Sequence, residues 1–363
     1  MQLRTRVAIA LLFVMARIGH AAPSDQKIHI SWVMHNDSEF WHLSQKIAEQ
    51  AAKDFGISIT IHFDSTHDRS SMANITEEIL RTLVKSPDTT YYLVTVGSFY
   101  PPERIIDLAT EKKVPMLVFN SPLTVPMTPR KGQQKGLIGA LIPNDQEAGY
   151  LQAKALLAED QRRNPGNGAH PQHIVAFGGW GRDTVDALRQ SGLRRAAREA
   201  GAIVDQYFYT GWSRDVAKDQ MARAHKRYPD TRVFWTAADY LGLAIASRTS
   251  ASSRDLIGGI DWSPEGVDAV LHGSGLFLSV GGHFFDPGWV TALIYDYHHG
   301  LDFAQVAPNY IISTRMAILT KESAKKLVSR FPNFDFSSID FKRYSRVYTK
   351  LSSYDFSANS LNL

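Results

Sequence analysis

The stretch from Lys27 to Phe63 decides the fold: KIHISWVMHNDSEFWHLSQKIAEQAAKDFGISITIHF. Its first eight residues are mostly β-branched or apolar, which favours a strand. After a polar turn, apolar residues recur at every fourth position, the spacing of one helix face. These positions are Leu43, Ile47, Ala51 and Phe55. Gly56 stands where a helix commonly ends, and a second strand follows, so the stretch predicts a strand–helix–strand unit.

The same alternation continues to about residue 320. It predicts an α/β fold with parallel sheets and helices on both faces. A polar break at Pro143-Asn144-Asp145 separates two similar halves, and Tyr310 to Leu319 is predicted as the last strand. Two such halves in tandem imply a cleft between them, with ligands bound beyond the carboxyl ends of the strands. The aromatic residues that follow predict a tail packed on the body.

The chain has 363 residues, no cysteine and a formal net charge of +4. The missing cysteines exclude a disulfide scaffold, a Cys-ligated metal site and a thiol nucleophile. Arg4, Arg6 and Arg17 lie in residues 1–21, which have the pattern of a signal peptide cleaved after Ala21. Without these three, 37 basic residues face 36 acidic ones, so no nucleic-acid partner is indicated. We expect an exported protein, most simply periplasmic, with no membrane insertion after cleavage.

Polar and aromatic side chains follow the predicted strands of both halves. In the first half these are Asn36, Ser38, Phe40, Trp41, Asn120 and Ser121. In the second half they are Arg189, Trp212, Asp239 and Asp261. Rings can cover the C–H face of a ligand, while an arginine can form paired bonds to hydroxyls or a carboxylate. Helix capping by Asp37 or Ser38, core packing of the rings and a solvated Arg189 are the structural alternatives.

The order and spacing of these motifs resemble type I periplasmic binding proteins, in particular the ribose/galactose-binding branch and the autoinducer-2 receptor LuxP. The resemblance covers Lys27 to about Thr320. Ser38-Glu39-Phe40-Trp41 stands where sugar binders carry Asn-Pro-Phe-Phe, and its Ser-x-x-Trp is closer to the LuxP form. Val118-Phe119-Asn120-Ser121 stands where ribose binders have an Asp-Arg pair. Arg189-Gln190-Ser191-Gly192-Leu193 resembles the segment whose arginine binds ligand, and Gly259-Ile260-Asp261 resembles Gly-Phe-Asp.

The resemblance implies further roles and a domain layout. Trp212 falls where a stacking phenylalanine is usual, Ala238-Asp239 replaces Asn-Asp, and His283 occupies the place of a polar ligand residue. Three interlobe crossings are implied, near Pro143, His283 and Asn309, with hinge closure on ligand. The N-terminal lobe then comprises residues 25–143 and 284–309, the C-terminal lobe 144–283 and 310–330, and a C-terminal extension 331–363.

These features predict a non-catalytic binding protein without cofactor or metal. Its ligand would be a sugar, a polyol or an autoinducer-2-like molecule, and its partner an inner-membrane ABC importer. The alternative is a LuxP-like receptor that regulates a membrane sensor, either a histidine kinase or a diguanylate cyclase. We expect Arg189→Ala to abolish ligand-induced stabilisation and to leave the melting temperature of the free protein nearly unchanged.

Enzyme classes lack their motifs in this sequence. No His-Glu-x-x-His occurs, and the neighbouring His298 and His299 point apart on a helix, which predicts a surface pair. Gly273-Ser274-Gly275 lacks the spacing of a serine-hydrolase turn. Gly178-Gly179-Trp180-Gly181 is not followed by the Gly-Lys-Ser/Thr of a phosphate-binding loop.

Overall fold

A computed structural model describes residues 26–35, 38–64, 71–97, 102–123, 136–165, 170–249, 254–302, 306–307 and 309–361. The predicted signal peptide and Asn36 lie outside these residues. Among the described residues, no helix is long and apolar enough to cross a membrane.

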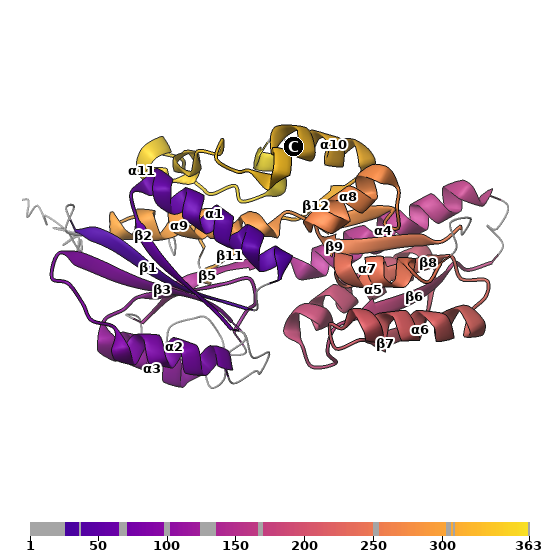
Figure 1. The fold of residues 1–363 in the computed structure, drawn as a ribbon, viewed down its shortest axis with the longest axis horizontal. Coiled ribbons are helices and arrows are strands. Elements are labelled where there is room, and N and C mark those ends of the chain that lie inside the picture. Colours follow the sequence, from indigo (N-terminus) through magenta and orange to yellow (C-terminus); the bar gives the residue numbers. More distant parts are fainter. Residues whose placement is uncertain are drawn as a thin grey trace, which may run out of the picture.

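The chain forms two lobes, each around a six-stranded sheet (Figure 1). The strands of the first are β1 (Lys27–Met34), β2 (Ser58–Phe63), β3 (Thr89–Val96), β4 (Met116–Phe119), β5 (Leu137–Pro143) and β11 (Ile311–Thr314). Those of the second are β6 (His173–Gly178), β7 (Ile203–Tyr209), β8 (Val233–Thr236), β9 (Leu256–Asp261), β10 (Leu278–Gly281) and β12 (Ala317–Leu319). The spatial orders are β2-β1-β3-β4-β5-β11 and β7-β6-β8-β9-β10-β12, so the two lobes have the same strand order. All pairs are parallel except β10 with β12, which confirms the predicted α/β class.

Helices cover both sheets. The first lobe carries α1 (Glu39–Phe55), α2 (Ser71–Thr82), α3 (Pro102–Lys112) and α9 (Asp286–His298). The second carries α4 (Asp145–Arg163), α5 (Thr184–Ala200), α6 (Arg214–Arg227), α7 (Asp239–Ala246), α8 (Pro264–His272) and α10 (Lys321–Arg330). In the first lobe, α1 and α9 lie above the sheet and α2 and α3 below it (Figure 1). Strands β4, β5 and β8 are buried at every residue, as expected when helices pack on both faces.

The chain crosses between the lobes three times. The first crossing is at Asn144, whose side chain caps α4 by accepting the N–H of Glu147 at 3.0 Å. The second is at Gly282, between β10 and the short 3-10 helix η2 (His283–Phe285) that leads into α9. The third is at Arg315 and Met316, between β11 and β12.

The single strand predicted from Tyr310 to Leu319 is wrong. Its first part, β11, pairs with β5 in the first lobe, and its second part, β12, pairs with β10 in the second. The third crossing therefore lies beyond the predicted position near Asn309, and Ile311–Thr314 belongs to the N-terminal lobe. Strand propensity is the same in both sheets, so it does not tell which sheet a strand joins.

Helices α4 and α5 approach each other unusually closely. A Cβ on Gly149 would lie 2.0 Å from the carbonyl oxygen of Arg189, and a Cβ on Gly192 would lie 1.9 Å from that of Gln146. Only glycine permits this approach at either position. The seam places Arg189 of α5 beside Asp145 at the start of α4.

His298 and His299, at the end of α9, were predicted to be a surface pair. This prediction is wrong for His298. His298 is buried, and its Nδ1 lies 3.2 Å from the hydroxyl of Tyr92 in β3. His299 is half-buried. A helix end that packs against a sheet can bury one of two adjacent side chains, which spacing alone does not reveal.

Candidate ligand-binding cleft

The shared strand order locates the candidate cleft. In sheets of this order, ligands bind at the carboxyl ends of the strands on either side of the point where the order reverses. Several residues at or after the carboxyl ends of strands in the two sheets have left-handed backbones, with φ of 65° at Asn120, 61° at Trp212, 135° at Asp261 and 62° at Trp262. Such conformations cost of order 1–3 kcal/mol each and cluster at functional sites.

Arg189 is held in a buried polar network in the second lobe. Its Nε donates to Asp145 Oδ1 at 2.7 Å, and one terminal nitrogen donates to the carbonyl oxygen of Ala237 at 2.6 Å. The same nitrogen lies 3.5 Å from Asp261 Oδ1. Arg189 is only 5% exposed, so it is not the solvated arginine of the structural alternative. The predicted proximity of Arg189 and Asp261 is present.

The charges of this network are set by burial and by one another. Burial opposes the charge of Arg189, but the carboxylates of Asp145 and Asp261 outweigh it and raise the pKa of its guanidinium. Burial raises the pKa of Asp261 well above its ordinary value, although Arg189 opposes the shift. Burial also raises the pKa of Asp145, again against the pull of Arg189. The network therefore holds one permanent cation between two carboxyl groups.

His283 connects this network to the first lobe. Its Nε2 lies 3.7 Å from Asp261 Oδ1, and its ring centroid lies 4.7 Å from that of Phe40 at the start of α1. Burial lowers the pKa of His283 well below its ordinary value, so the imidazole is neutral at physiological pH. A neutral imidazole can both donate and accept hydrogen bonds.

Phe40 is the half-buried ring of the first lobe at this site, whereas Trp41 and Phe119 are buried in the core beside it, as the core-packing alternative expects. The Trp41 ring centroid lies 5.1 Å from that of Phe40 and 5.9 Å from that of Phe119 at the end of β4. Asn120 follows Phe119, and its Oδ1 accepts from the hydroxyl of Ser121 at 3.4 Å. Ser38 precedes α1 but makes no capping hydrogen bond through its side chain. The capping alternative therefore does not account for Ser38.

Trp212 is anchored to the helix that carries Arg189. Its Nε1 donates to Asp183 Oδ2 at 2.8 Å, and Asp183 also caps α5 by accepting the N–H of Val185 at 2.9 Å. The indole lies so close over Gly179, just after β6, that a Cβ there would be 2.0 Å from it. This fixes the ring beside the carboxyl end of β6, in line with its predicted stacking position.

The structure contradicts a ligand contact at Asp239. This side chain is fully buried, and its oxygens accept from Ser279 Oγ at 2.6 Å and from the Ser263 N–H at 2.9 Å. Burial raises its pKa to about 6. Asp239 instead supports the turn after β9 that carries Asp261.

Sequence reasoning missed two residues of the cleft. Asp145 was noted only as part of a polar break, yet it is the main partner of Arg189. Tyr240, at the start of α7, lies within electrostatic reach of Asp261 and Arg189, and burial raises its pKa. The sequence contained a signal for Asp145. This acidic residue comes soon after a strand, and in such sheets ligands bind beyond the carboxyl ends of the strands.

The two lobes touch across the cleft. Glu39 at the start of α1 accepts a hydrogen bond from the backbone N–H of Glu265 in α8. His283 Nε2, on the first-lobe side of the second crossing, lies 3.7 Å from Asp261 Oδ1 of the second lobe. Within the second lobe, Arg214 at the start of α6 pairs with the same Glu265 at 2.6 Å and lies over the ring of Tyr240 at 5.4 Å.

Comparison with known proteins agrees with this architecture. A family model described as "Periplasmic binding protein domain" matches residues 30–294. A periplasmic sugar-binding protein from Pseudomonas fluorescens is 26% identical with a TM-score of 0.78, covering 92% of this chain and 99% of that one. A search of curated proteins found no match.

Two more distant structures share the fold. A galactofuranose-binding protein is 15% identical with a TM-score of 0.69, covering 85% of this chain and 100% of that one. An ABC transporter periplasmic solute-binding protein from Actinobacillus succinogenes with bound D-allose is 15% identical with a TM-score of 0.63, covering 83% of this chain and 100% of that one. With a family model matched over most of its length and two lobes joined by three crossings, the chain belongs to the type I periplasmic binding proteins.

Proposed function

We propose that this protein captures a sugar or sugar-like molecule in the interlobe cleft and presents the closed form to an inner-membrane ABC importer. It would act in the periplasm, after cleavage of the signal peptide, and would not transform its ligand. The proposal extends the family assignment to a ligand class and a partner.

The observation that carries the proposal is the pairing of a polar network with an aromatic ring. Arg189, Asp261 and His283 offer donors and acceptors within a few ångströms of one another. The ring of Phe40 lies against His283, with centroids 4.7 Å apart, and the buried ring of Trp41 packs edge-on against Phe40. Sugars have hydroxyls at their edges and C–H groups on their faces, so they match both halves of such a site.

A thermal-shift screen tests the proposal. The panel contains pentoses, hexoses, polyols, autoinducer-2 and borate. A ligand at 100 times its Kd adds about 2.7 kcal/mol to the stability of the folded protein, which is readily detected. We expect a saturable shift with at least one sugar or polyol. Turnover of any compound in the panel would contradict a purely binding function.

A pair of matched variants locates the site. Asp261→Asn keeps the shape of the side chain but removes its charge and one acceptor, so the ligand-induced shift should be lost or strongly reduced. Asp268→Asn makes the same change on the exposed surface of α8, where the side chain is 69% exposed, and should keep the full shift. Equal ligand-induced thermal shifts in both variants would show that Asp261 does not contact the ligand.

The same panel separates the importer from the sensor. Ser38, Trp41 and Asn120 match the LuxP-like form of the motifs, which favours a receptor that regulates a membrane sensor. A shift with autoinducer-2, with or without borate, and none with sugars would support that receptor. A shift with sugars or polyols alone would support the importer.

A further inference from the structure

The C-terminal extension, here residues 331–361, returns from the second lobe to the first. It follows α10, whose Ala324 and Leu327 are buried against the second lobe. In Figure 1 it runs above α1 and α9, through α11 (Arg346–Thr349), and back towards the middle of the molecule. The extension therefore adds a fourth passage between the lobes.

A buried carboxylate in α9 anchors the extension to the first lobe. Asp296 is 0% exposed and accepts a hydrogen bond from the hydroxyl of Ser345. It also accepts from the N–H of Arg346 at 2.7 Å, the N–H of Val347 at 3.3 Å and the hydroxyl of Tyr354 at 2.9 Å. Four hydrogen bonds thus converge on one buried side chain, which makes this a firm attachment.

Stacked rings add to this anchor. The ring of Phe356 stacks on Trp289 of α9, with centroids 5.5 Å apart and planes at 15°. Tyr344 meets the edge of the same indole at 6.0 Å. Buried aromatic pairs of this kind contribute beyond the area they bury.

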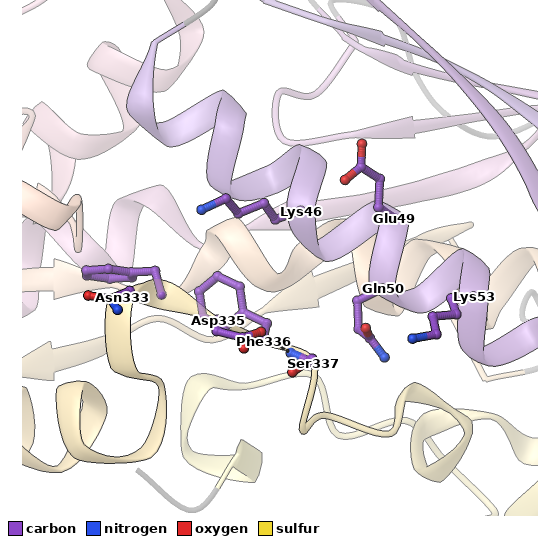
Figure 2. A pocket seen from close by; sticks show the side chains of 9 residues that line it. Lys46, Glu49, Gln50, Lys53, Asn333, Asp335, Phe336 and Ser337 are labelled. Carbon is purple, nitrogen blue, oxygen red and sulfur yellow. Dashed lines mark hydrogen bonds between the residues drawn. The ribbon is translucent and has the colours of Figure 1, made fainter.

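Against α1 the packing is looser. A groove of about 370 Å³ separates the side chains of Lys46, Glu49, Gln50 and Lys53 from residues 333–337 (Figure 2). Beyond the groove, Gln50 donates to the carbonyl oxygen of Ile339 at 3.4 Å. Asp54 accepts the N–H of Phe341 at 2.8 Å. The extension is therefore held mainly through α9 and at the crossings.

The extension contacts two of the three crossings directly. At the third, the N–H of Arg315 donates to the carbonyl oxygen of Phe356 at 3.1 Å, and the N–H of Ala358 donates to that of Arg315 at 3.4 Å. At the second, Ala358 packs on Gly282 so closely that a Cβ on that glycine would lie 2.6 Å from the Ala358 methyl carbon.

Aromatic contacts reinforce the second crossing. The ring centroid of Phe336 in the extension lies 5.7 Å from that of Phe284 and 5.3 Å from that of Phe285, both in η2. Phe331 meets Phe285 at 6.3 Å. The backbone that must turn when the lobes separate is thus packed under the extension.

We propose that the C-terminal extension restrains the hinge and holds the lobes closed. Domain closure is absorbed by a few backbone torsions at the ends of elements, here at Gly282 and Arg315. Rotation at Arg315 breaks its two bonds to the extension, or else drags the extension away from Asp296. The contacts favour the lobe arrangement in which they form, so they raise the population of that arrangement before ligand arrives and slow ligand release. The restraint goes beyond the proposed function and is measurable without any ligand.

The experiment measures the interlobe distance in the ligand-free protein. The chain has no cysteine, so Glu78→Cys in α2 and Arg223→Cys in α6, both exposed, give one spin-label pair for pulsed electron resonance. In this labelled background we expect a single narrow distance distribution. Ala358→Glu forces a charged side chain against Gly282, so the distribution should broaden and move to a new distance.

The control introduces the same charge elsewhere in the extension. Leu351 is 45% exposed, so Leu351→Glu should leave the distribution unchanged. Asp296→Asn releases the extension from α9 without touching a crossing, and should shift the distribution in the same direction as Ala358→Glu. Unchanged distributions in both test variants would overturn the restraint.

Both variants could fail to fold, so a further measurement uses the unsubstituted protein. Hydrogen exchange at the Arg315 amide should be slow, because this N–H is bonded to the extension. Fast exchange at this amide would also overturn the restraint. Neither outcome depends on whether a sugar binds, so the restraint and the proposed function fail separately.

Discussion

The two lobes share a strand order but bring opposite chemistry to the cleft. The second lobe presents Arg189, Asp145 and Asp261, bonded to one another and buried. The first lobe presents the half-buried ring of Phe40, which packs on the buried Trp41, and Asn120 follows β4. In the second lobe the polar groups are positioned by partners within the same lobe, so their geometry does not depend on closure.

This difference assigns a separate task to each lobe. A network fixed within one lobe can orient a ligand before the cleft closes, since no reorganisation is needed. Under the proposed function, the ring of Phe40 on the other lobe would then cover the ligand and exclude water. We therefore expect substitutions in the second lobe to affect both stability and binding, and those at the rim of the first lobe to affect binding alone.

The largest effect is expected for Arg189→Ala. The variant leaves Asp145 and Asp261 without their cation, and breaking a buried pair costs about 3–5 kcal/mol. The melting temperature of the free protein should therefore fall, contrary to the expectation from sequence, and the ligand-induced shift should be lost. Calorimetry of the free and ligand-loaded protein measures both. Arg198→Ala, on the exposed face of the same helix, is the control and should change neither.

The next prediction tests whether a buried carboxyl group beside the hinge behaves like those of the second lobe. Burial raises the pKa of Asp286, which faces Thr314 at the third crossing, well above the ordinary value of 3.8. Between these two pKa values the folded state binds the proton and the unfolded state does not, so this group lowers stability as pH rises. Asn cannot ionise.

Asp286→Asn should therefore become more stable relative to the parent as pH rises from about 4 to 8. Thermal unfolding at both pH values measures the difference in melting temperature. Asp219→Asn, exposed on α6, is the control and should show the same difference at each pH. A constant difference for Asp286→Asn as well would mean that its carboxyl titrates normally.

Phe40→Ala tests the first lobe. The substitution removes a half-buried ring that contacts His283 and would contact the bound ligand. We expect binding to weaken roughly tenfold, about 1.4 kcal/mol. The stability of the free protein should change little. Titration calorimetry gives the Kd. Phe40→Leu keeps much of the apolar volume and should fall between parent and Ala. A large loss of free-protein stability in Phe40→Ala would contradict the separation of tasks.

The smallest effect is expected at the rim. Arg214 and Glu265 form a pair in which both side chains are nearly half exposed, and such pairs contribute about 0–1 kcal/mol. Arg214→Ala should change the Kd less than threefold, and the change should shrink in high salt. A tenfold loss would show that the rim, and not the network, carries the binding energy.

The sequence was sufficient for the fold class, and it named Arg189 and Asp261, which the structure brings together. The alternation of strands and helices fixed the α/β architecture, and the strand ends led to Arg189, Asp261 and Phe40. These inferences work because parallel strands all end at one edge of a sheet. Asn36 lies outside the described residues, and its contact stays a prediction.

What sequence missed depends on contacts between distant segments. Asp145 lies 44 positions from Arg189, and the two meet only because α4 and α5 pack closely. Asp239 follows a strand as a ligand residue would, but its partners in the turn after β9 draw it inwards. The third crossing was misplaced because neighbouring β-rich segments join different sheets.

The close seam between α4 and α5 has a consequence for changing the specificity of this protein. Gly149 and Gly192 have no side chain with which to hold a ligand, yet they set the distance between the helix that carries Asp145 and the helix that carries Arg189. A methyl group at either position would push the helices apart and separate the pair. A library designed for new ligands can therefore vary the half-buried Phe40, but it must leave these two glycines untouched.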